Sequence, residues 1–186
     1  MIKRILAVML LVVLVGCNTG GTLKPNTLSV DDLCIYKDDD KKNKVCYGMS
    51  RSEAEKILGT GTKEAFGIRY DYGVKILYRV DNIAMIVLDK DSKNVYSTVR
   101  GNKIGNLKED VLKTYGDKYP IIRETSPQSI DYIYDLENKK FLGEVSYEKI
   151  DSKKYKDHLY VSAGFNEDEY VNRIFLGDKE AIMYLR

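Results

Sequence analysis

The feature that most constrains the fold is a ten-residue segment, bounded by glycines, that occurs twice in the chain. The copies are MSRSEAEKIL between Gly48 and Gly59, and NLKEDVLKTY between Gly105 and Gly116. In each copy the apolar residues recur at helical spacing, which predicts a short helix with one buried stripe. A glycine after the last apolar residue favours a helix end, because glycine adopts positive φ without steric cost. The sequence therefore predicts one short helix in each half of the chain.

Both segments also begin with a helix-capping signal. Ser50 is followed three residues later by Glu53, and Asn106 is followed three residues later by Glu109. A Ser or Asn side chain at the N-cap can accept a hydrogen bond from a free backbone N–H, and the Glu side chain can accept one in return. We expect Ser50 and Asn106 to be the two N-cap residues.

The two segments align at an offset of 57 residues (105 minus 48). A second alignment, of residues 88–103 with residues 164–179, has an offset of 76 and pairs Gly101 with Gly177. The increase of 19 (76 minus 57) would place nineteen extra residues in the second copy. We interpret this self-similarity as an internal duplication.

After each predicted helix, alternating apolar and polar residues predict antiparallel strands separated by polar turns. The expected strands are residues 74–80, 84–88 and 95–100 in the first half, and 130–135, 141–147, 159–165 and 170–176 in the second. Residues 148–158 are expected to form a loop, and residues 180–186 either a strand or a short helix.

These elements predict an α+β fold. We expect two tandem repeats, residues 30–101 and 102–186, each a short helix followed by an antiparallel four-stranded meander. The pattern leaves open whether the two sheets lie side by side as one.

Residues 1–16 have the composition of an export signal. Two basic residues precede an apolar run, residues 5–15, that is too short to span a membrane. The run ends in Leu-Val-Gly-Cys17, which resembles the lipobox of bacterial lipoproteins. The resemblance implies that Cys17 is lipidated and becomes the mature N-terminus, which would anchor the protein to the cell membrane outside the cytoplasm. The other interpretation is an ordinary signal peptide beside an unrelated cysteine.

Residues 17–29 are rich in Gly, Thr, Asn and Pro, and we predict a flexible tether there. Without Lys3 and Arg4 of the signal, the chain has 28 basic residues (30 minus 2) and 28 acidic residues. This balance argues against a nucleic-acid partner and against electrostatic binding to the membrane surface.

Two further cysteines, Cys34 and Cys46, would face an oxidising compartment, and we expect them to form a disulfide. A pair of free thiols is the alternative for a host that avoids disulfides. The charged residues 37–44 between them lack the glycine and the glutamate of a calcium loop, which favours a solvated hairpin tip.

We find no residue pattern typical of catalysis, of a metal site or of a cofactor site. His158 is the only histidine, lies in a charged segment and is predicted to be on the surface. Residues 60–64, TGTKE, fit neither common phosphate-loop pattern. We therefore expect a non-enzymatic protein without a cofactor, although a carboxylate pair assembled by the fold would leave no pattern in the sequence.

The chain has fifteen tyrosines and no tryptophan. Tyrosine is favoured in strands and is also enriched in protein contact surfaces. We take Tyr70 and Tyr160, which we expect on exposed sheet faces, as candidate partner contacts.

The glycine-bounded helix, the tyrosine-rich meander and the second copy of the helix resemble a superfamily of secreted proteins, over about residues 44–178. Its members include the β-lactamase inhibitor proteins and the small lipoprotein of the outer-membrane barrel assembly machinery. The resemblance implies two units whose sheets lie side by side and grip a protein partner. This chain differs from the inhibitors in its lipid anchor, its lack of tryptophan and its single cysteine pair, so β-lactamase inhibition is not carried over.

The sequence therefore favours a membrane-anchored lipoprotein that acts as a non-catalytic protein-binding module at the cell envelope. One alternative is a structural or assembly lipoprotein of an envelope complex, which would bind only when Cys17 is lipidated. The other is a hydrolase of wall or lipid components, which requires converging carboxylates in a pocket.

Overall fold

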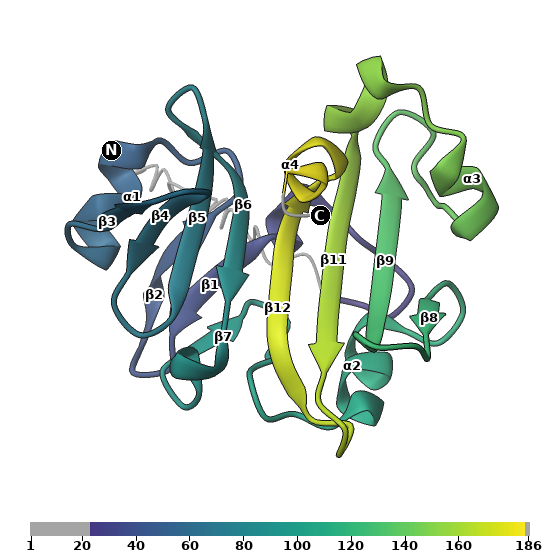
Figure 1. Ribbon diagram of the computed structural model, residues 1–186, viewed down its shortest axis with the longest axis horizontal. Coiled ribbons are helices and arrows are strands. Elements are labelled where there is room, and N and C mark those ends of the chain that lie inside the picture. The colour runs from purple at the N-terminus through teal and green to yellow at the C-terminus, as the bar shows by residue number, and fades with distance from the viewer. Residues whose placement is uncertain (1–22, 185–186) are drawn as a thin grey trace, which may run out of the picture.

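The computed structural model describes residues 23–184, which form an α+β fold built mainly of antiparallel strands (Figure 1). Both predicted helices are confirmed, as α1 (Arg51–Leu58) and α2 (Lys108–Tyr115). Each helix is followed by a glycine with positive φ, 80° at Gly59 and 104° at Gly116.

One of the two predicted caps is correct. At α1 the Ser50 hydroxyl accepts a hydrogen bond from the Glu53 amide at 3.4 Å, and the Ser50 amide donates to the Glu53 carboxylate at 3.1 Å. At α2 the prediction of Asn106 was wrong by one residue, because the N-cap is Leu107, whose amide donates to the Asp110 carboxylate at 3.0 Å. Two adjacent acids, Glu109 and Asp110, could each supply that carboxylate, and the sequence did not distinguish them.

A large antiparallel sheet contains strands from both halves of the chain, in the order β10-β9-β11-β12-β6-β5-β4-β3, with β8 also paired to β9. The strands of the first half are β3 (Thr62–Glu64), β4 (Gly67–Tyr70), β5 (Val74–Arg79) and β6 (Asn82–Leu88). Those of the second half are β8 (Ile121–Arg123), β9 (Ser129–Asp135), β10 (Lys140–Phe141), β11 (His158–Phe165) and β12 (Val171–Asp178).

The two halves meet where β6 pairs with β12. Four residue pairs form this junction, from Ile174 opposite Leu88 to Gly177 opposite Met85. Only glycine fits at the last pair, because a Cβ on Gly177 would lie 2.5 Å from the carbonyl oxygen of Ala84. The strands of the two halves therefore form one continuous sheet.

A second, three-stranded sheet has the order β2-β1-β7. It consists of β1 (Cys34–Lys37), β2 (Asp40–Cys46) and β7 (Tyr96–Thr98). The strand expected at residues 95–100 was assigned to the first meander, and that assignment was wrong, because β7 pairs with β1. The alignment at an offset of 76 was also wrong, since Gly101 lies in a turn with a φ of 87° and Gly177 lies inside β12.

The second half differs from the expected elements between β9 and β11. The strand expected at residues 141–147 is replaced by the two-residue β10 and by helix α3 (Glu144–Glu148). The expected loop at residues 148–158 contains a 3₁₀ helix, η3 (Ser152–Asp157). The C-terminal segment, left open between strand and helix, forms the short helix α4 (Lys179–Met183).

The predicted disulfide between Cys34 and Cys46 is present and joins β1 to β2, where the two residues lie directly opposite each other. The chain-entropy account gives a crosslink of this loop length about 3 kcal/mol of stabilisation. The crosslink holds the hairpin whose buried Ile35 and Val45 pack in the main core.

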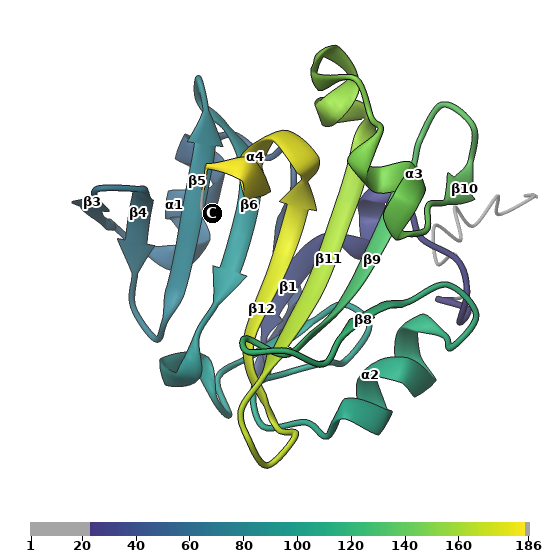
Figure 2. The same ribbon diagram turned by 45° about the vertical axis from the view of Figure 1, so that its right-hand side comes forward.

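The large sheet has two differently covered faces (Figure 2). Its inner face packs against α1, α2 and the small sheet, and presents side chains such as Ile76, Ile86 and Leu176 to the main core. Its outer face carries a second apolar cluster that includes Met85 and Tyr160 and is partly covered by α4. Strand alternation produces both faces, because successive side chains point to opposite sides of a sheet.

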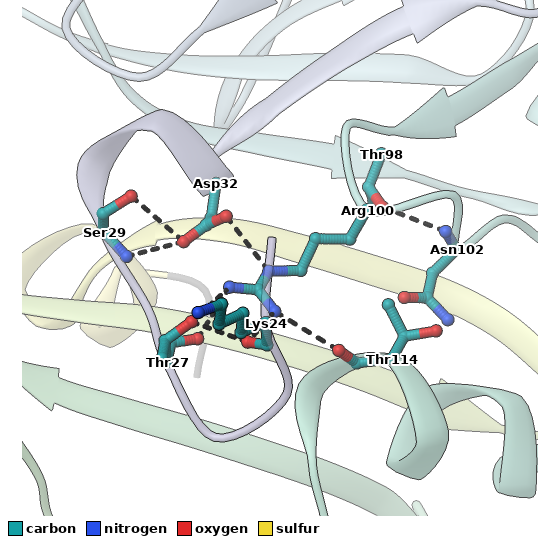
Figure 3. Close-up of polar contacts among 8 residues, drawn as sticks. All are labelled: Lys24, Thr27, Ser29, Asp32, Thr98, Arg100, Asn102 and Thr114. Atoms are coloured by element: carbon teal, nitrogen blue, oxygen red, sulfur yellow. Dashed lines mark hydrogen bonds and ion pairs between the residues drawn. The ribbon is translucent and has the colours of Figure 1, made fainter. Parts of the chain in front are cut away.

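A buried arginine fixes the N-terminal segment to the fold (Figure 3). The Arg100 side chain is 1% exposed, and its Nε donates to Asp32 at 3.0 Å. Its other nitrogens donate to the carbonyl oxygens of Lys24 at 3.1 Å, Thr27 at 2.7 Å and Thr114 at 3.2 Å. Thr114 belongs to the last turn of α2, where a cation is favourable.

This junction corrects the predicted tether. Residues 24–29 are held against the fold by Arg100, and Leu28 is buried in the main core. The rest of the predicted tether that precedes Leu23 lies outside the described residues. The expected start of the folded part near Val30 was therefore too late, because the Arg100 guanidinium binds the backbone carbonyls of Lys24 and Thr27, and composition does not reveal such contacts.

We predict that Arg100→Met lowers the free energy of unfolding by about 3–5 kcal/mol, because it leaves the Asp32 carboxylate buried without its cation. Urea denaturation of residues 23–186 measures the change. The matched control is Arg51→Met, which breaks an exposed ion pair with Glu55 and should leave the stability nearly unchanged. Equal effects of the two substitutions would contradict the role of Arg100.

Buried tyrosines make the fold sensitive to alkaline pH. Burial raises the pKa of Tyr96 and of Tyr115 to about 12, because each phenolate would lose its hydration. An unfolded tyrosine has a pKa of about 10, so the folded state favours the neutral phenol and its contribution is complete below pH ~10. The contribution is lost as the pH rises towards 12.

We therefore predict that the free energy of unfolding falls above pH ~10 by about 1.4 kcal/mol per pH unit for each such tyrosine. Urea denaturation between pH 8 and pH 11.5 measures the slope. Tyr115→Phe should reduce the slope, because phenylalanine does not titrate. A stability that stays constant above pH ~10 in the natural sequence would refute the prediction.

Candidate functional site

The predicted site residues lie in different surroundings from those expected. Cys17 lies outside the described residues. Tyr70 was expected to be exposed, which was wrong: it is 3% exposed, faces the main core and shares a 2.7 Å hydrogen bond with the Tyr78 hydroxyl. Tyr160 is 2% exposed and belongs to the outer-face cluster. The alternation of side chains along a strand does not show that both faces of the sheet are covered at these positions.

His158 is buried, so the prediction that it lies on the surface was wrong. It begins β11 beneath η3, where its Nδ1 lies 2.7 Å from the Lys154 carbonyl oxygen. Its Nε2 lies 3.7 Å from the Asp135 carboxylate. The charged residues before it turn back over it as a 3₁₀ helix, which explains why the composition of the segment was misleading.

The outer face of the large sheet contains a groove of about 570 Å³ beside α4, which we call the outer groove. Its floor is formed by β11 and β12, and its walls by the segment between β8 and β9 and by Ile182 of α4. On the floor, Tyr160, Ser162 and Gly164 occupy alternate positions of β11, and Phe175 lies on β12 opposite Ser162.

Gly164 gives the groove its depth. Its backbone does not require glycine, because its φ is not positive and an added Cβ would meet only ordinary contacts, the nearest at 3.5 Å from Asn172. A larger residue would therefore fit the strand and fill the groove. The glycine leaves space above the floor that a ligand side chain can occupy.

A buried ion pair shapes one wall of the groove. The Asp131 carboxylate is 1% exposed and accepts hydrogen bonds from Arg123 Nε at 3.1 Å and from the Ser162 hydroxyl at 2.6 Å. The Arg123 guanidinium also donates to Glu144 at 3.1 Å. Because both partners of Asp131 hold it in place, the carboxylate is compensated and the guanidinium is fixed at the rim.

Two further polar groups face the outer groove. Arg173 is exposed, and its guanidinium lies 6.0 Å from the ring centre of Phe175, within the range of a cation–π contact. The Gln128 side-chain oxygen is buried and has no hydrogen-bond partner among the described residues. A buried acceptor of this kind favours a ligand that brings an N–H or O–H donor.

Helix α4 is held over the outer face by a buried carboxylate. Asp178 is fully buried, caps α4 by accepting from the Ala181 amide at 2.9 Å, and accepts two bonds from Arg79 at 2.8 and 2.9 Å. The Tyr47 hydroxyl donates to the same carboxylate at 2.7 Å, and Arg79 also contacts Glu180 at 2.6 Å. Residues from both halves of the chain therefore fix the wall of the groove.

On the other side of α4 lies a second hollow of about 440 Å³. Phe66, 56% exposed, and Tyr184, 65% exposed, stand at its edges. Together with the outer groove, it gives the outer face two hollows with aromatic and polar linings, which α4 separates. Exposed aromatic side chains in a hollow are typical of protein contact sites.

Among residues 23–184 no group of three or more His, Cys, Asp or Glu side chains is arranged to hold a metal ion. In the same part of the chain, no helix is long and apolar enough to cross a membrane. No Asp or Glu is among the described residues that line the outer groove, and the oxygens of the neighbouring Asp131 are occupied by Arg123 and Ser162. The arrangement is suited to binding by shape, by aromatic contact and by hydrogen bonding.

We predict that Asp178→Ala lowers the free energy of unfolding by about 3 kcal/mol, because Arg79 and the α4 N-terminus both lose their partner. Tyr47→Phe is the milder comparison, since it removes one hydrogen bond to the same carboxylate and should cost about 1 kcal/mol. Hydrogen exchange of the α4 amides together with urea denaturation measures both effects. Unchanged protection of α4 in Asp178→Ala would show that this carboxylate does not hold the helix.

No protein family, curated protein or solved structure matches this chain. The resemblance to the superfamily of inhibitor and assembly proteins therefore stays an expectation.

Proposed function

We propose that the protein is a bacterial lipoprotein, anchored through Cys17, that acts as a non-catalytic protein-binding module at the cell envelope. We further propose that the outer groove and the neighbouring hollow form its binding surface. The observation that carries this proposal is the partly covered outer face, where Phe175, Arg173 and the unpartnered Gln128 oxygen surround a space left by Gly164.

The residue types at this surface support a protein ligand. Aromatic and arginine side chains in desolvated hollows contribute most of the energy in many protein interfaces. The groove also offers Tyr160 and Ser162, which add polar atoms to an apolar floor. A partner side chain that enters the space above Gly164 could contact the Phe175 ring and donate to Gln128.

The disulfide between Cys34 and Cys46 is in keeping with a location outside the cytoplasm. The signal-like residues 1–16 and the cysteine that follows them are the basis for the lipid anchor. Mass spectrometry of the mature protein tests this part directly, because diacylglycerol on Cys17 adds a defined mass.

We also infer that the two halves of the chain derive from one duplicated unit. The support is a set of three backbone hydrogen bonds before α1 that have equivalents before α2. In the first half they join Gly48 N to Ile83 O, Ile83 N to Met49 O and Arg51 N to Asp81 O; in the second, Gly105 N to Val171 O, Val171 N to Asn106 O and Lys108 N to Glu169 O.

The equivalent residues before the two helices, Gly48 and Gly105, are 57 positions apart (105 minus 48). Their equivalent hydrogen-bond partners, Ile83 and Val171, are 88 positions apart (171 minus 83). Most of the difference falls between β9 and β11, which are joined by residues 136–157, whereas β4 and β5 are joined by residues 71–73. The second unit would therefore contain an insertion with β10, α3 and η3, of which η3 contacts α4.

We predict that Gly164→Leu weakens binding of residues 23–186 to its envelope partner by about tenfold or more, because the leucine fills the outer groove. Gly143→Leu is the control, since a Cβ at Gly143 meets nothing within 4 Å and the residue does not line the groove. The measurement is capture from solubilised envelope, with the captured partner then titrated against each variant. Both variants should unfold at nearly the natural temperature.

Equal binding by the Gly164→Leu and Gly143→Leu proteins would show that the outer groove is not the binding surface. A partner that is captured only by the lipidated form would instead support the assembly lipoprotein. Neither outcome depends on loss of the fold, because both substitutions are made where a side chain can be accommodated.

A further inference from the structure

We propose that the side of the protein around Lys24 lies against an anionic membrane surface and contacts its lipid headgroups. We call this side the junction face; its central residues are Leu23, Lys24, Lys118 and Tyr119. The inference rests on the proposed lipid anchor at Cys17, and it adds the orientation of the protein and a second contact with the membrane.

The described chain begins at a point that is fixed to the fold, next to Lys24. Arg100 binds the carbonyl oxygen of Lys24 at 3.1 Å (Figure 3), and the Asn26 amide donates to the Tyr115 carbonyl oxygen at 2.7 Å. The Asn26 side chain accepts from the Lys118 amide at 3.0 Å. Lys24 is therefore held by Arg100, and the residues that follow it are attached to the end of α2 and to the turn after that helix.

Only a short length of chain joins this point to the proposed lipid anchor. Lys24 follows Cys17 by seven positions (24 minus 17). A fully extended chain spans at most about 3.6 Å per residue, so Lys24 lies within ~25 Å of the acylated cysteine. The lipid anchor therefore keeps the start of the described chain, and with it the junction face, within this distance of the membrane.

The junction face exposes apolar, aromatic and basic side chains. Leu23 is 45% exposed, and Tyr119 is 36% exposed and stacks on Phe141 with ring centres 4.9 Å apart. The Lys118 ammonium lies 5.0 Å from the Tyr119 ring centre. Tyrosine and lysine with apolar neighbours are typical of the headgroup region, where an apolar body is buried and a polar end stays in water.

The junction face carries more positive than negative charge. Lys24 and Lys118 are exposed at the centre of the junction face, and Lys113 is exposed at the border of a hollow that Pro25 also lines. The exposed acids in that hollow are Glu109 and Asp117, which leaves an excess of one positive charge over these five side chains (three minus two).

This local excess changes the expectation from composition. The balanced total charge argues against electrostatic attachment of the protein as a whole, but a lipid tether raises the effective concentration of the junction face at the membrane to the order of millimolar. A weak patch of this kind then suffices for contact. The outer groove lies on the other face of the large sheet and stays accessible to a partner.

The experiment uses the full chain, expressed with its signal and purified in the lipidated form. A fluorophore is attached to Lys118→Cys on the junction face or, as the matched control, to Lys156→Cys, which lines the hollow beside α4. The proteins are placed in vesicles of phosphatidylglycerol and phosphatidylcholine that carry a headgroup-attached nitroxide quencher. We expect at least twofold stronger quenching at position 118, although this substitution removes one of the proposed contacts.

A variant with a longer tether tests whether contact with lipid, and not the short tether alone, keeps the junction face at the membrane. Ten Gly and Ser residues are inserted between Thr22 and Leu23, and the stronger quenching at position 118 should persist. It should fall to the level of position 156 when Tyr119→Ser is added or when phosphatidylglycerol is replaced by phosphatidylcholine. Loss of the difference on lengthening alone would overturn the proposed contact with lipid.

The remaining outcomes distinguish this inference from the proposed function. A mature protein without acyl groups on Cys17, which does not float with vesicles, would overturn both the anchor and the orientation. A lipidated protein with equal quenching at positions 118 and 156 would overturn only the orientation. Neither result bears on the outer groove, whose test uses the soluble domain.

Discussion

The pairing of β6 with β12 is the contact on which the rest of the structure depends. It joins strands that lie almost ninety positions apart in the chain (171 minus 82), and it tolerates no side chain at Gly177. Without it, each half would expose a strand edge with unpaired backbone groups, which are costly when buried and prone to association when exposed. Because of it, the main core and the outer face both continue across the two halves.

The two faces of the large sheet are covered by different means. The inner face meets two helices and a disulfide-linked small sheet, whereas α4, only five residues long, covers part of the outer face. So short a helix is not stable alone, and its position depends on the buried Asp178 and its partners. The outer groove exists because that cover is incomplete and because Gly164 leaves the floor open beside it.

Local signals predicted local structure well, and long-range contacts account for the errors. The cap at Ser50 and six of the seven expected strands could be predicted from spacing, because those features depend on neighbours in sequence. The burial of His158 could not, since η3 folds back over it, and the partner of β7 could not, since a three-residue strand carries no signal for β1. The outer groove combines Gly164 with residues of other strands, and no sequence spacing links them.

The Arg100 junction has a mechanical consequence. If a partner in the outer groove is pulled while Cys17 stays in the membrane, the load enters the fold at Lys24. It then passes through the guanidinium to the last turn of α2 and, through Asp32, to the chain that leads into β1. Several hydrogen bonds to one rigid group would have to break together, and the crosslink at Cys34 and Cys46 prevents β1 and β2 from separating as a zipper. The Arg100 cluster, which fixes the N-terminal segment to the fold, would thus determine how much force a protein tethered in this way transmits before it begins to unfold.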